Sequence, residues 1–219
     1  RIPEIRWVRI LYCYPDRVTD ELLEVMAQEE KIVKYMDLPI QHASGKVLRE
    51  MNRRGDRAWL EALMAKIREK VPGVILRTTL IAGFPGETQE DFAELCEFVQ
   101  NVKFERLGCF AYSQEENTPA GEREDQIDEE TKQRRVEVLM TAQMANVEAF
   151  NRSMLGKTLP VLVEGYEEES GLYYGRSPMD APDIDTRTYF TTARPVQAGD
   201  FVDVTIQDVL EYDLLGQAQ

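Results

Sequence analysis

The hydrophobic pattern of this chain changes its period near residue 155. Up to that point, short apolar runs alternate with amphipathic stretches, which is the rhythm of βα units around a parallel sheet. We expect about four such units, with strands at residues 5–12, 33–38, 74–81 and 104–112. The strongest unit is the third, because an apolar run ends in Gly83 and leads into a stretch that Thr88 can cap as a helix. Thr19 and Ser44 are expected to cap earlier helices, and a long helix is expected at about residues 128–154.

Beyond residue 155, apolar residues recur at every second position between Gly, Pro and Asp turns. This pattern is typical of a small five-stranded antiparallel barrel. Strands are expected at residues 158–164, 172–176, 187–190 and 201–209. The sequence therefore predicts two domains, an α/β domain at residues 1–155 and a β-barrel domain at residues 156–219.

Composition excludes a disordered or membrane-spanning chain. The 219 residues are 43% hydrophobic with a mean hydropathy of −0.42, which is typical of a folded, water-soluble protein. No apolar run approaches the roughly 20 residues that cross a bilayer, and no secretory signal opens the chain. We therefore expect a cytoplasmic protein.

The charge balance constrains the partners. The chain has 26 Lys and Arg against 40 Asp and Glu, for a net charge of −14, and residues 151–219 alone carry −7. A surface that follows nucleic-acid phosphates normally has the opposite sign, whereas an acidic barrel suits a basic protein. One basic cluster stands out, formed by Arg49, Arg53, Arg54 and Arg57; it is either a solvated helix surface or a contact to substrate.

The cysteines and the single histidine limit the chemistry. Cys13, Cys96 and Cys109 are odd in number and widely spaced, which favours reduced core thiols over disulfides or a zinc site. With one histidine and no nucleophile turn, no Ser/His/Asp or Cys/His set can be assembled. The sequence therefore argues against a self-contained hydrolase.

Candidate binding residues lie where predicted strands end, because parallel βα folds bind ligands at the carboxyl ends of their strands. Gln41 and His42 follow the second strand and could reach a ribose or an amino-acid carboxylate, although His42 could equally have a structural role. Residues 83–88 place two glycines before a helix N-terminus that could receive an anion, or they form a simple turn. Arg77, inside the third strand, needs a carboxylate or phosphate partner if it is buried, so a ligand contact and an internal salt bridge stay equally open. One of Thr78 and Thr79 must point toward any ligand.

Several long motifs, taken together and in order, closely resemble the radical S-adenosylmethionine methylthiotransferases. These motifs are residues 35–44 (YMDLPIQHAS), 47–54 (VLREMNRR), 76–88 (LRTTLIAGFPGET), 110–113 (FAYS) and 118–119 (TP). The tail resembles the TRAM domain that ends these enzymes, at residues 174–185 (YGRSPMDAPDID) and 211–216 (EYDLLG). The resemblance implies an α/β fold in which a partial radical SAM (β/α) barrel is followed by a small OB-like TRAM barrel.

Two branches of this family compete. The Gln41-His42 pair, residues 180–185 and the acidic tail resemble the branch that methylthiolates an aspartate β-carbon in a small-subunit ribosomal protein. The other branch methylthiolates an isopentenylated adenosine in tRNA, for which an acidic tail is poorly suited. A non-catalytic module that binds a ribosomal partner is the third alternative.

The family uses S-adenosylmethionine and a 4Fe–4S cluster held by a C-x-x-x-C-x-x-C motif, with an auxiliary cluster on an N-terminal domain. That motif is absent from this sequence, and the three cysteines match neither cluster's ligands. We therefore expect the chain to be the carboxyl half of a longer enzyme, and to be inactive by itself, with no cluster and weak cofactor affinity.

The resemblance also assigns residues to roles. It places Gln41 and His42 near the ribose, Arg77 toward the methionine carboxylate, and the strand end at Ile81 and Gly83, with Phe110 and Tyr112, beside the adenine. For the protein substrate, it implicates Arg176, Asp180, Asp183 and Asp185 of the tail. No catalytic residue and no metal ligand is expected in this chain.

Overall fold

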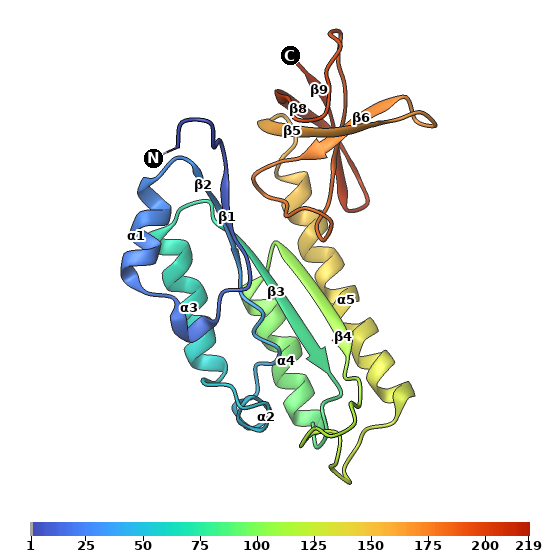
Figure 1. The fold of residues 1–219 in the computed structure, drawn as a ribbon. Coiled ribbons are helices and arrows are strands. Elements are labelled where there is room, and N and C mark those ends of the chain that lie inside the picture. The colour runs from blue at the N-terminus through green and yellow to red at the C-terminus, as the bar shows by residue number, and fades with distance from the viewer. Residues whose placement is uncertain (1) are drawn as a thin grey trace.

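The first region is a four-stranded parallel sheet, as predicted (Figure 1). The computed structural model describes residues 2–219. The strands are β1 (Val8–Ile10), β2 (Ile32–Asp37), β3 (Ile75–Ala82) and β4 (Arg106–Ala111), and they lie side by side in chain order. The helical elements are η1 (Pro15–Arg17), α1 (Asp20–Gln28), α2 (Gly45–Glu50), α3 (Arg57–Lys70), α4 (Gln89–Val102) and α5 (Glu129–Arg152).

The helices begin where local sequence predicts. The side chains of Thr19, Ser44 and Thr88 accept hydrogen bonds from backbone N–H groups in the first turns of α1, α2 and α4. Thr88 and Asp91 form a reciprocal capping box, which satisfies two N–H groups that a helix start leaves without partners. Asp128 caps α5, because its side chain accepts a hydrogen bond from the Thr131 N–H.

The sheet has one face covered by helices and one open face, which contacts the barrel only near the amino ends of the strands. Because side chains alternate along a strand, Leu76 and Leu80 of β3 pack with α1, α3 and α4 in one apolar core. Ile75 lies on the other face, where it joins Tyr35 and the apolar interior of the second region. Of the two adjacent threonines, Thr78 is buried and donates to the Leu38 carbonyl, whereas the Thr79 hydroxyl accepts from Arg77 on the open face.

The second region is a closed five-stranded barrel. Its strands are β5 (Thr158–Glu167), β6 (Leu172–Arg176), β7 (Thr188–Thr191), β8 (Phe201–Leu210) and β9 (Asp213–Ala218), in the order β5-β6-β7-β9-β8. The prediction of a purely antiparallel barrel is wrong at one point, because β7 and β9 run parallel. The hairpin of β8 and β9 returns the last strand to the free edge of β7, which closes the barrel.

The barrel and the loops after the strands lie at opposite ends of the sheet. In Figure 1, the β3 arrow points away from the barrel, to the end of the sheet at which α2 also lies. The barrel thus adjoins the amino ends of the strands, and the loops that follow β2 and β3 form the other end. Within residues 2–219, no helix is long and apolar enough to cross a membrane.

Candidate functional site

The loop after β2 runs along the carboxyl end of β3. The Gln41 N–H donates to the Thr79 carbonyl at 2.9 Å, and the Ile81 N–H donates to the Gln41 carbonyl at 2.8 Å. Gln41 has a φ of 70°, a left-handed conformation that turns the chain out of the sheet. Its side-chain Oε1 is buried and has no hydrogen-bond partner within residues 2–219. A buried acceptor of this kind is a natural place for a ligand hydroxyl or amine.

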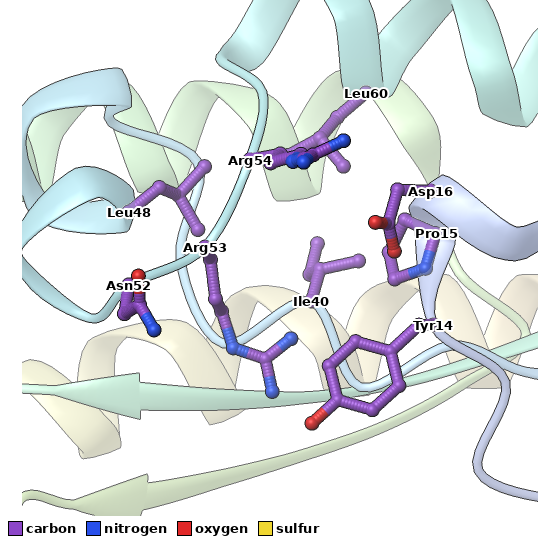
Figure 2. Close-up of a pocket in the computed structure, with 9 residues that line it drawn as sticks. All are labelled: Tyr14, Pro15, Asp16, Ile40, Leu48, Asn52, Arg53, Arg54 and Leu60. Atoms are coloured by element: carbon purple, nitrogen blue, oxygen red, sulfur yellow. The ribbon is translucent and has the colours of Figure 1, made fainter.

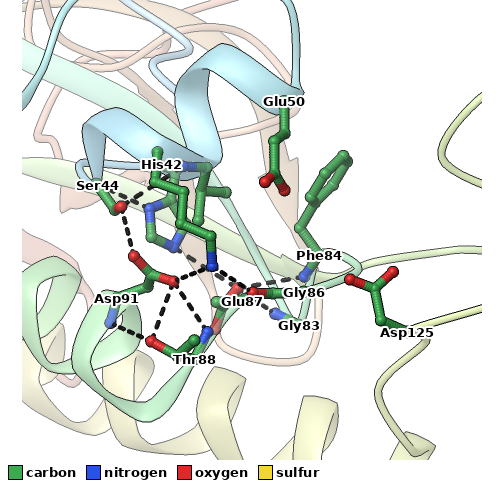
Figure 3. Close-up of polar contacts among 12 residues, drawn as sticks. His42, Ser44, Glu50, Gly83, Phe84, Gly86, Glu87, Thr88, Asp91 and Asp125 are labelled. Carbon is green, nitrogen blue, oxygen red and sulfur yellow. Dashed lines mark hydrogen bonds and ion pairs between the residues drawn. The ribbon is translucent and has the colours of Figure 1, made fainter. Parts of the chain in front are cut away.

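Next to Gln41 in the chain begins a group of buried polar residues that we call the carboxyl-edge cluster: His42, Ser44, Glu87, Asp91 and Arg135. Figure 3 shows the first four of them. The His42 ring is fully buried; its Nδ1 accepts from the Ser44 N–H at 3.0 Å, and its Nε2 lies 3.6 Å from Glu87 Oε2. The imidazole thus connects the loop that follows β2 to the turn that precedes α4. Its predicted contact with a ribose stays a prediction, and complete burial does not favour it.

Glu87 occupies the predicted anion site. Its Oε2 accepts from the Gly83 and Phe84 N–H groups at 2.7 and 3.2 Å, and its Oε1 pairs with Arg135 at 2.7 Å. Gly83 has a φ of 78°, and a side chain there would collide with Lys132. The backbone turn at residues 83–88 therefore binds the chain's own carboxylate, and the need for glycine at position 83 is structural.

Asp91 links the starts of α2 and α4. The Ser44 hydroxyl donates to Asp91 Oδ1 at 2.7 Å, and the Thr88 N–H and Lys46 Nζ donate to Oδ2 at 3.0 and 3.1 Å. Burial alone would raise the pKa of Asp91, but these hydrogen bonds lower it to about 2. The carboxylate is thus held in its charged form.

The structure brings most of the predicted cofactor residues together at the carboxyl edge. Ile81 pairs in register with Phe110 of β4, and the Tyr112 N–H donates to the Ala82 carbonyl at 2.9 Å. The Phe110 side chain is 60% exposed, so its ring is available to stack on a ligand. Gln41, Ile81, Gly83, Phe110 and Tyr112 therefore share one end of the sheet.

Arg77 lies on the open face of the same sheet, nearer to the barrel, and it lines one pocket together with Phe110. It is the third residue of β3 and stands five positions before the end of the strand, about 17 Å away along it. Its Nε donates to Asp185 at 3.3 Å, and its Nη1 donates to Asp37 and Thr79 at 3.2 Å. Of the two alternatives left open for this guanidinium, the structure shows the internal salt bridge.

Two of the predicted substrate residues are also internal. Arg106 donates to Asp180 Oδ1 through Nη2 at 2.7 Å and through Nε at 3.2 Å, and Tyr35 donates to Asp185 Oδ2 at 2.5 Å. The side chains of Asp180 and Asp185 are only 1% and 3% exposed, so they bind the sheet and do not face a docking partner. We call Asp37, Arg77, Arg106, Asp180 and Asp185 the junction cluster. Of the other two predicted residues, Arg176 pairs with Glu164 at 2.7 Å, and Asp183 is exposed.

The cysteines do not form a metal site. Cys13, Cys96 and Cys109 are half-buried free thiols packed against the helical core, and burial raises the pKa of Cys109 to about 12. Among residues 2–219, no group of three His, Cys, Asp or Glu side chains is placed to hold a metal ion. The residues of this chain therefore do not fit a 4Fe–4S cluster, whose ligands are thiolates.

Comparison with known proteins relates each of the two regions to a known family. Residues 2–99 match the radical SAM superfamily, and residues 155–218 match the TRAM domain. The solved structure of coproporphyrinogen III oxidase (HemN) from Escherichia coli, a radical SAM enzyme, superposes with a TM-score of 0.51 at 21% identity, over 65% of this chain and 32% of that one. The chain thus combines part of a radical SAM fold with a TRAM domain.

The resemblance to the methylthiotransferases is confirmed at the level of sequence. The chain is 47% identical over 217 residues to the ribosomal protein uS12 methylthiotransferase RimO of Caldanaerobacter subterraneus subsp. tengcongensis, covering 99% of this chain and 49% of the relative. It is 46% identical to RimO of Lachnoclostridium phytofermentans, over 100% of this chain and 50% of the relative. The chain is therefore a relative of the RimO enzymes and spans about half their length.

Proposed function

We propose that this chain works as part of a radical SAM methylthiotransferase that adds a methylthio group to an aspartate β-carbon in a small-subunit ribosomal protein. The observation that supports this function is the similarity to RimO enzymes at 46–47% identity along nearly the whole chain. The two regions are proposed to be separate domains that meet near residue 155, where α5 ends and β5 begins. The cytoplasmic location expected from the sequence stays a prediction.

S-adenosylmethionine fits the carboxyl edge of the sheet. The buried Oε1 of Gln41, which lacks a partner among the described residues, would accept from a ribose hydroxyl, and the exposed ring of Phe110 would face the adenine. Ile81, Gly83 and Tyr112 would line the same end of the sheet. When bound, this cofactor supplies the radical that activates an unreactive carbon. The role of the chain is to hold and orient the cofactor. His42 stabilises the carboxyl edge through its contacts with Ser44 and Glu87.

The cluster that reduces the cofactor is proposed to have its ligands outside this chain, because the three cysteines are dispersed and packed in the core. The chain by itself is therefore expected to lack methylthiotransferase activity. The guanidinium of Arg77 forms ion pairs with Asp37 and Asp185, and its predicted contact with the methionine carboxylate stays a prediction.

The acidic barrel is proposed to attract the basic ribosomal protein. Its available charges are exposed carboxylates such as Glu168, Glu169 and Asp183, and not the buried Asp180 and Asp185. Long-range attraction of this kind speeds association and depends on ionic strength.

The test uses the full-length natural protein, reconstituted anaerobically with iron and sulfide and supplied with S-adenosylmethionine and reductant. It is offered either ribosomal protein uS12 or tRNA, and the products are analysed by mass spectrometry. We expect a methylthio mass gain on uS12, and none when the present chain replaces the full-length protein. A gain on tRNA alone would contradict the proposal, and no gain on either, with clusters verified, would favour a non-catalytic module.

A further inference from the structure

A groove runs along β4 from the barrel toward the carboxyl edge of the sheet, and we call it the β4 groove. Its volume is about 470 Å³, and its lining comes from β4, from α5 and from residues 184–186 and 212–213 of the second region. In Figure 1, α5 lies beside β4 and leads into the barrel. Phe110, whose exposed ring is proposed to face the adenine, lines this groove together with Asp213 at the start of β9. The β4 groove therefore adjoins both the proposed cofactor residues and the acidic barrel.

The pocket in Figure 2 has a different position. It lies beside the carboxyl ends of β1 and β2, and its volume is about 130 Å³. The Arg53 guanidinium lies there over the Tyr14 ring, 5.2 Å from its centroid, and its Nη1 donates to the Pro39 carbonyl at 2.9 Å. Among residues 2–219, none of those proposed to contact the cofactor lines this pocket. Of the two, the β4 groove alone is placed to bring a substrate to the cofactor.

Gly108 lines the β4 groove at a position where the fold does not require a glycine. It is the third residue of β4, and its φ is not in the left-handed region. A Cβ at this position would lie 3.7 Å from the Phe110 ring and 3.9 Å from Arg77 Nη2, which are ordinary contact distances. Other strand glycines are enclosed, because an added Cβ would come within 2.6 Å of a neighbouring atom: Gly165, Gly175 and Gly216. Among the strand glycines of residues 2–219, Gly108 alone therefore has room for a side chain.

The room in front of Gly108 points to a bound chain. A glycine inside a strand weakens the strand, because it loses more conformational entropy on folding and packs no side chain. Such a glycine often marks a place where a ligand or another backbone approaches closely. Gly108 pairs in register with Thr79, and its missing side chain leaves space on the open face of the sheet between Arg77 and Phe110.

The lining of the β4 groove suits a basic peptide. Met140, Val147 and Ile184 are apolar and can contact the stem of a long side chain. Two arginines also line the groove, but each already pairs with a carboxylate of the junction cluster. Asp213 forms no ion pair within residues 2–219, and its Oδ1 accepts from the Arg187 N–H at 2.7 Å. Because the barrel is acidic, a Lys or Arg side chain in the groove meets a favourable potential and an available carboxylate.

We propose that the β4 groove binds an extended segment of a basic protein substrate, and that Gly108 keeps this groove open for the peptide backbone. The segment contacts the barrel near Asp213, passes over Gly108 and presents its reacting side chain beside Phe110. The reacting carbon stays uncovered in this arrangement, because the groove leads to the residues proposed to hold the cofactor. This inference rests on the proposed function, and it names Gly108 as a residue that determines access of the substrate.

The first experiment measures binding of uS12 to the reconstituted full-length protein, together with the affinity for S-adenosylmethionine and the melting temperature. Gly108→Val places a branched side chain in the groove at a strand position that suits it, so the affinity for uS12 should fall about tenfold. Gly108→Ala adds one methyl group at ordinary contact distances and should have a smaller effect. Neither change should lower the melting temperature or the affinity for S-adenosylmethionine. Ala145→Leu, at an exposed position of α5 outside the groove, is the control and should leave uS12 binding unchanged.

A second variant tests the acidic end of the groove. Asp213→Asn keeps an oxygen that can accept from the Arg187 N–H but removes the charge, so the affinity for uS12 should fall about threefold and depend less on salt. Asp203→Asn removes the same charge from an exposed position of β8 outside the groove and should change the affinity less. Equal effects of the two changes would contradict the placement of a basic side chain in the groove.

Several results would overturn the inference. If Gly108→Val binds uS12 as tightly as the natural sequence, the groove does not hold the substrate, and modification of uS12 by the unaltered protein would show that the proposed function stands. If Gly108→Val weakens the affinity for S-adenosylmethionine and leaves uS12 binding unchanged, the groove belongs to the cofactor. If both Gly108 variants lower the melting temperature in step with uS12 binding, the glycine is structural. If the unaltered protein neither binds nor modifies uS12, the inference and the proposed function fail together.

Discussion

The carboxyl-edge cluster and the junction cluster are both buried and charged, but they are built in different ways. His42, Ser44, Glu87 and Asp91 come from two consecutive βα units and from the loops that follow neighbouring strands. The junction cluster depends on partners that are far apart in the chain, because Arg106 and Asp180 are 74 residues apart and Arg77 and Asp185 are 108 apart. The first cluster therefore belongs to the sheet itself, and the second holds the barrel against it.

The difference assigns separate roles to the two clusters. At the carboxyl edge, the Gln41 acceptor lacks a partner among the described residues and the Phe110 ring is exposed, while a rigid cluster holds the neighbouring loops, which is what a ligand site needs. In the junction cluster, the carboxylates of residues 180 and 185 already neutralise the arginines, so this cluster is structural.

Glu87→Ala should destabilise the protein most. The change removes the partner of the buried Arg135 and leaves the Gly83 and Phe84 N–H groups without an acceptor, at a cost of about 3 to 5 kcal/mol in the free energy of unfolding. Urea unfolding followed by circular dichroism measures it. Glu90→Ala, at an exposed position in the first turn of α4, is the control and should cost far less. A small effect at Glu87 would mean that the cluster does not organise the carboxyl edge.

Asp185→Asn should loosen the attachment of the barrel. It removes the charge that faces Arg77 and Tyr35, but Arg77 keeps Asp37, so we expect a loss of about 1 to 3 kcal/mol. Hydrogen exchange should rise in residues 177–186 more than in α3 or α4. Asp183→Asn, two positions away and exposed, should change neither quantity. Equal effects of the two substitutions would show that the junction does not depend on the buried pair.

Acid should weaken the carboxyl edge through Asp91. Its pKa of about 2 in the folded state lies below the ordinary value of about 3.9, so its stabilising contribution is present above pH 4 and is lost as the pH falls toward 2. The expected loss is about 1 to 2 kcal/mol. Unfolding measured from pH 5 to pH 2 should show a shallower pH dependence in Asp91→Asn than in the natural sequence. The same slope in both proteins would contradict the assignment.

Thr19→Ala should have the smallest effect, because Thr19 caps α1 and contacts neither cluster. Loss of its hydrogen bond from the Leu22 N–H should cost about 1 kcal/mol. The change should leave hydrogen exchange at both ends of the sheet unaltered. Altered exchange in residues 38–44 or 177–186 would mean that the two clusters are coupled through the helical layer.

Local features of this fold could be predicted from the sequence, because neighbouring residues determine them. The caps at Thr19, Ser44 and Thr88 and the four parallel strands were predicted and are present. The strand at the end of the chain, β9, was not assigned, and its parallel pairing with β7 depends on closure of the barrel. Apolar periodicity carries no information about such long-range pairing.

The candidate site was predictable to a similar degree. Gln41, Ile81 and Phe110 meet because the ends of parallel strands share one edge. The partners of Arg77, Asp180 and Asp185 could not be predicted. The sequence does not show whether a charged side chain is exposed to solvent or paired with an opposite charge far away in the chain. Glu87 was part of a noted motif, yet its fourfold contact with Gly83, Phe84, His42 and Arg135 appears only when the loops are assembled.

The most direct test of the division between the two clusters measures the affinity of the reconstituted full-length protein for S-adenosylmethionine, together with its melting temperature. Gln41→Asn shortens the amide while tolerating the left-handed backbone, so it should weaken the affinity about tenfold at an unchanged melting temperature. Asp185→Asn should lower the melting temperature and leave the affinity unchanged. The opposite pattern, with affinity lost at Asp185 and retained at Gln41, would contradict the account and place the cofactor at the junction.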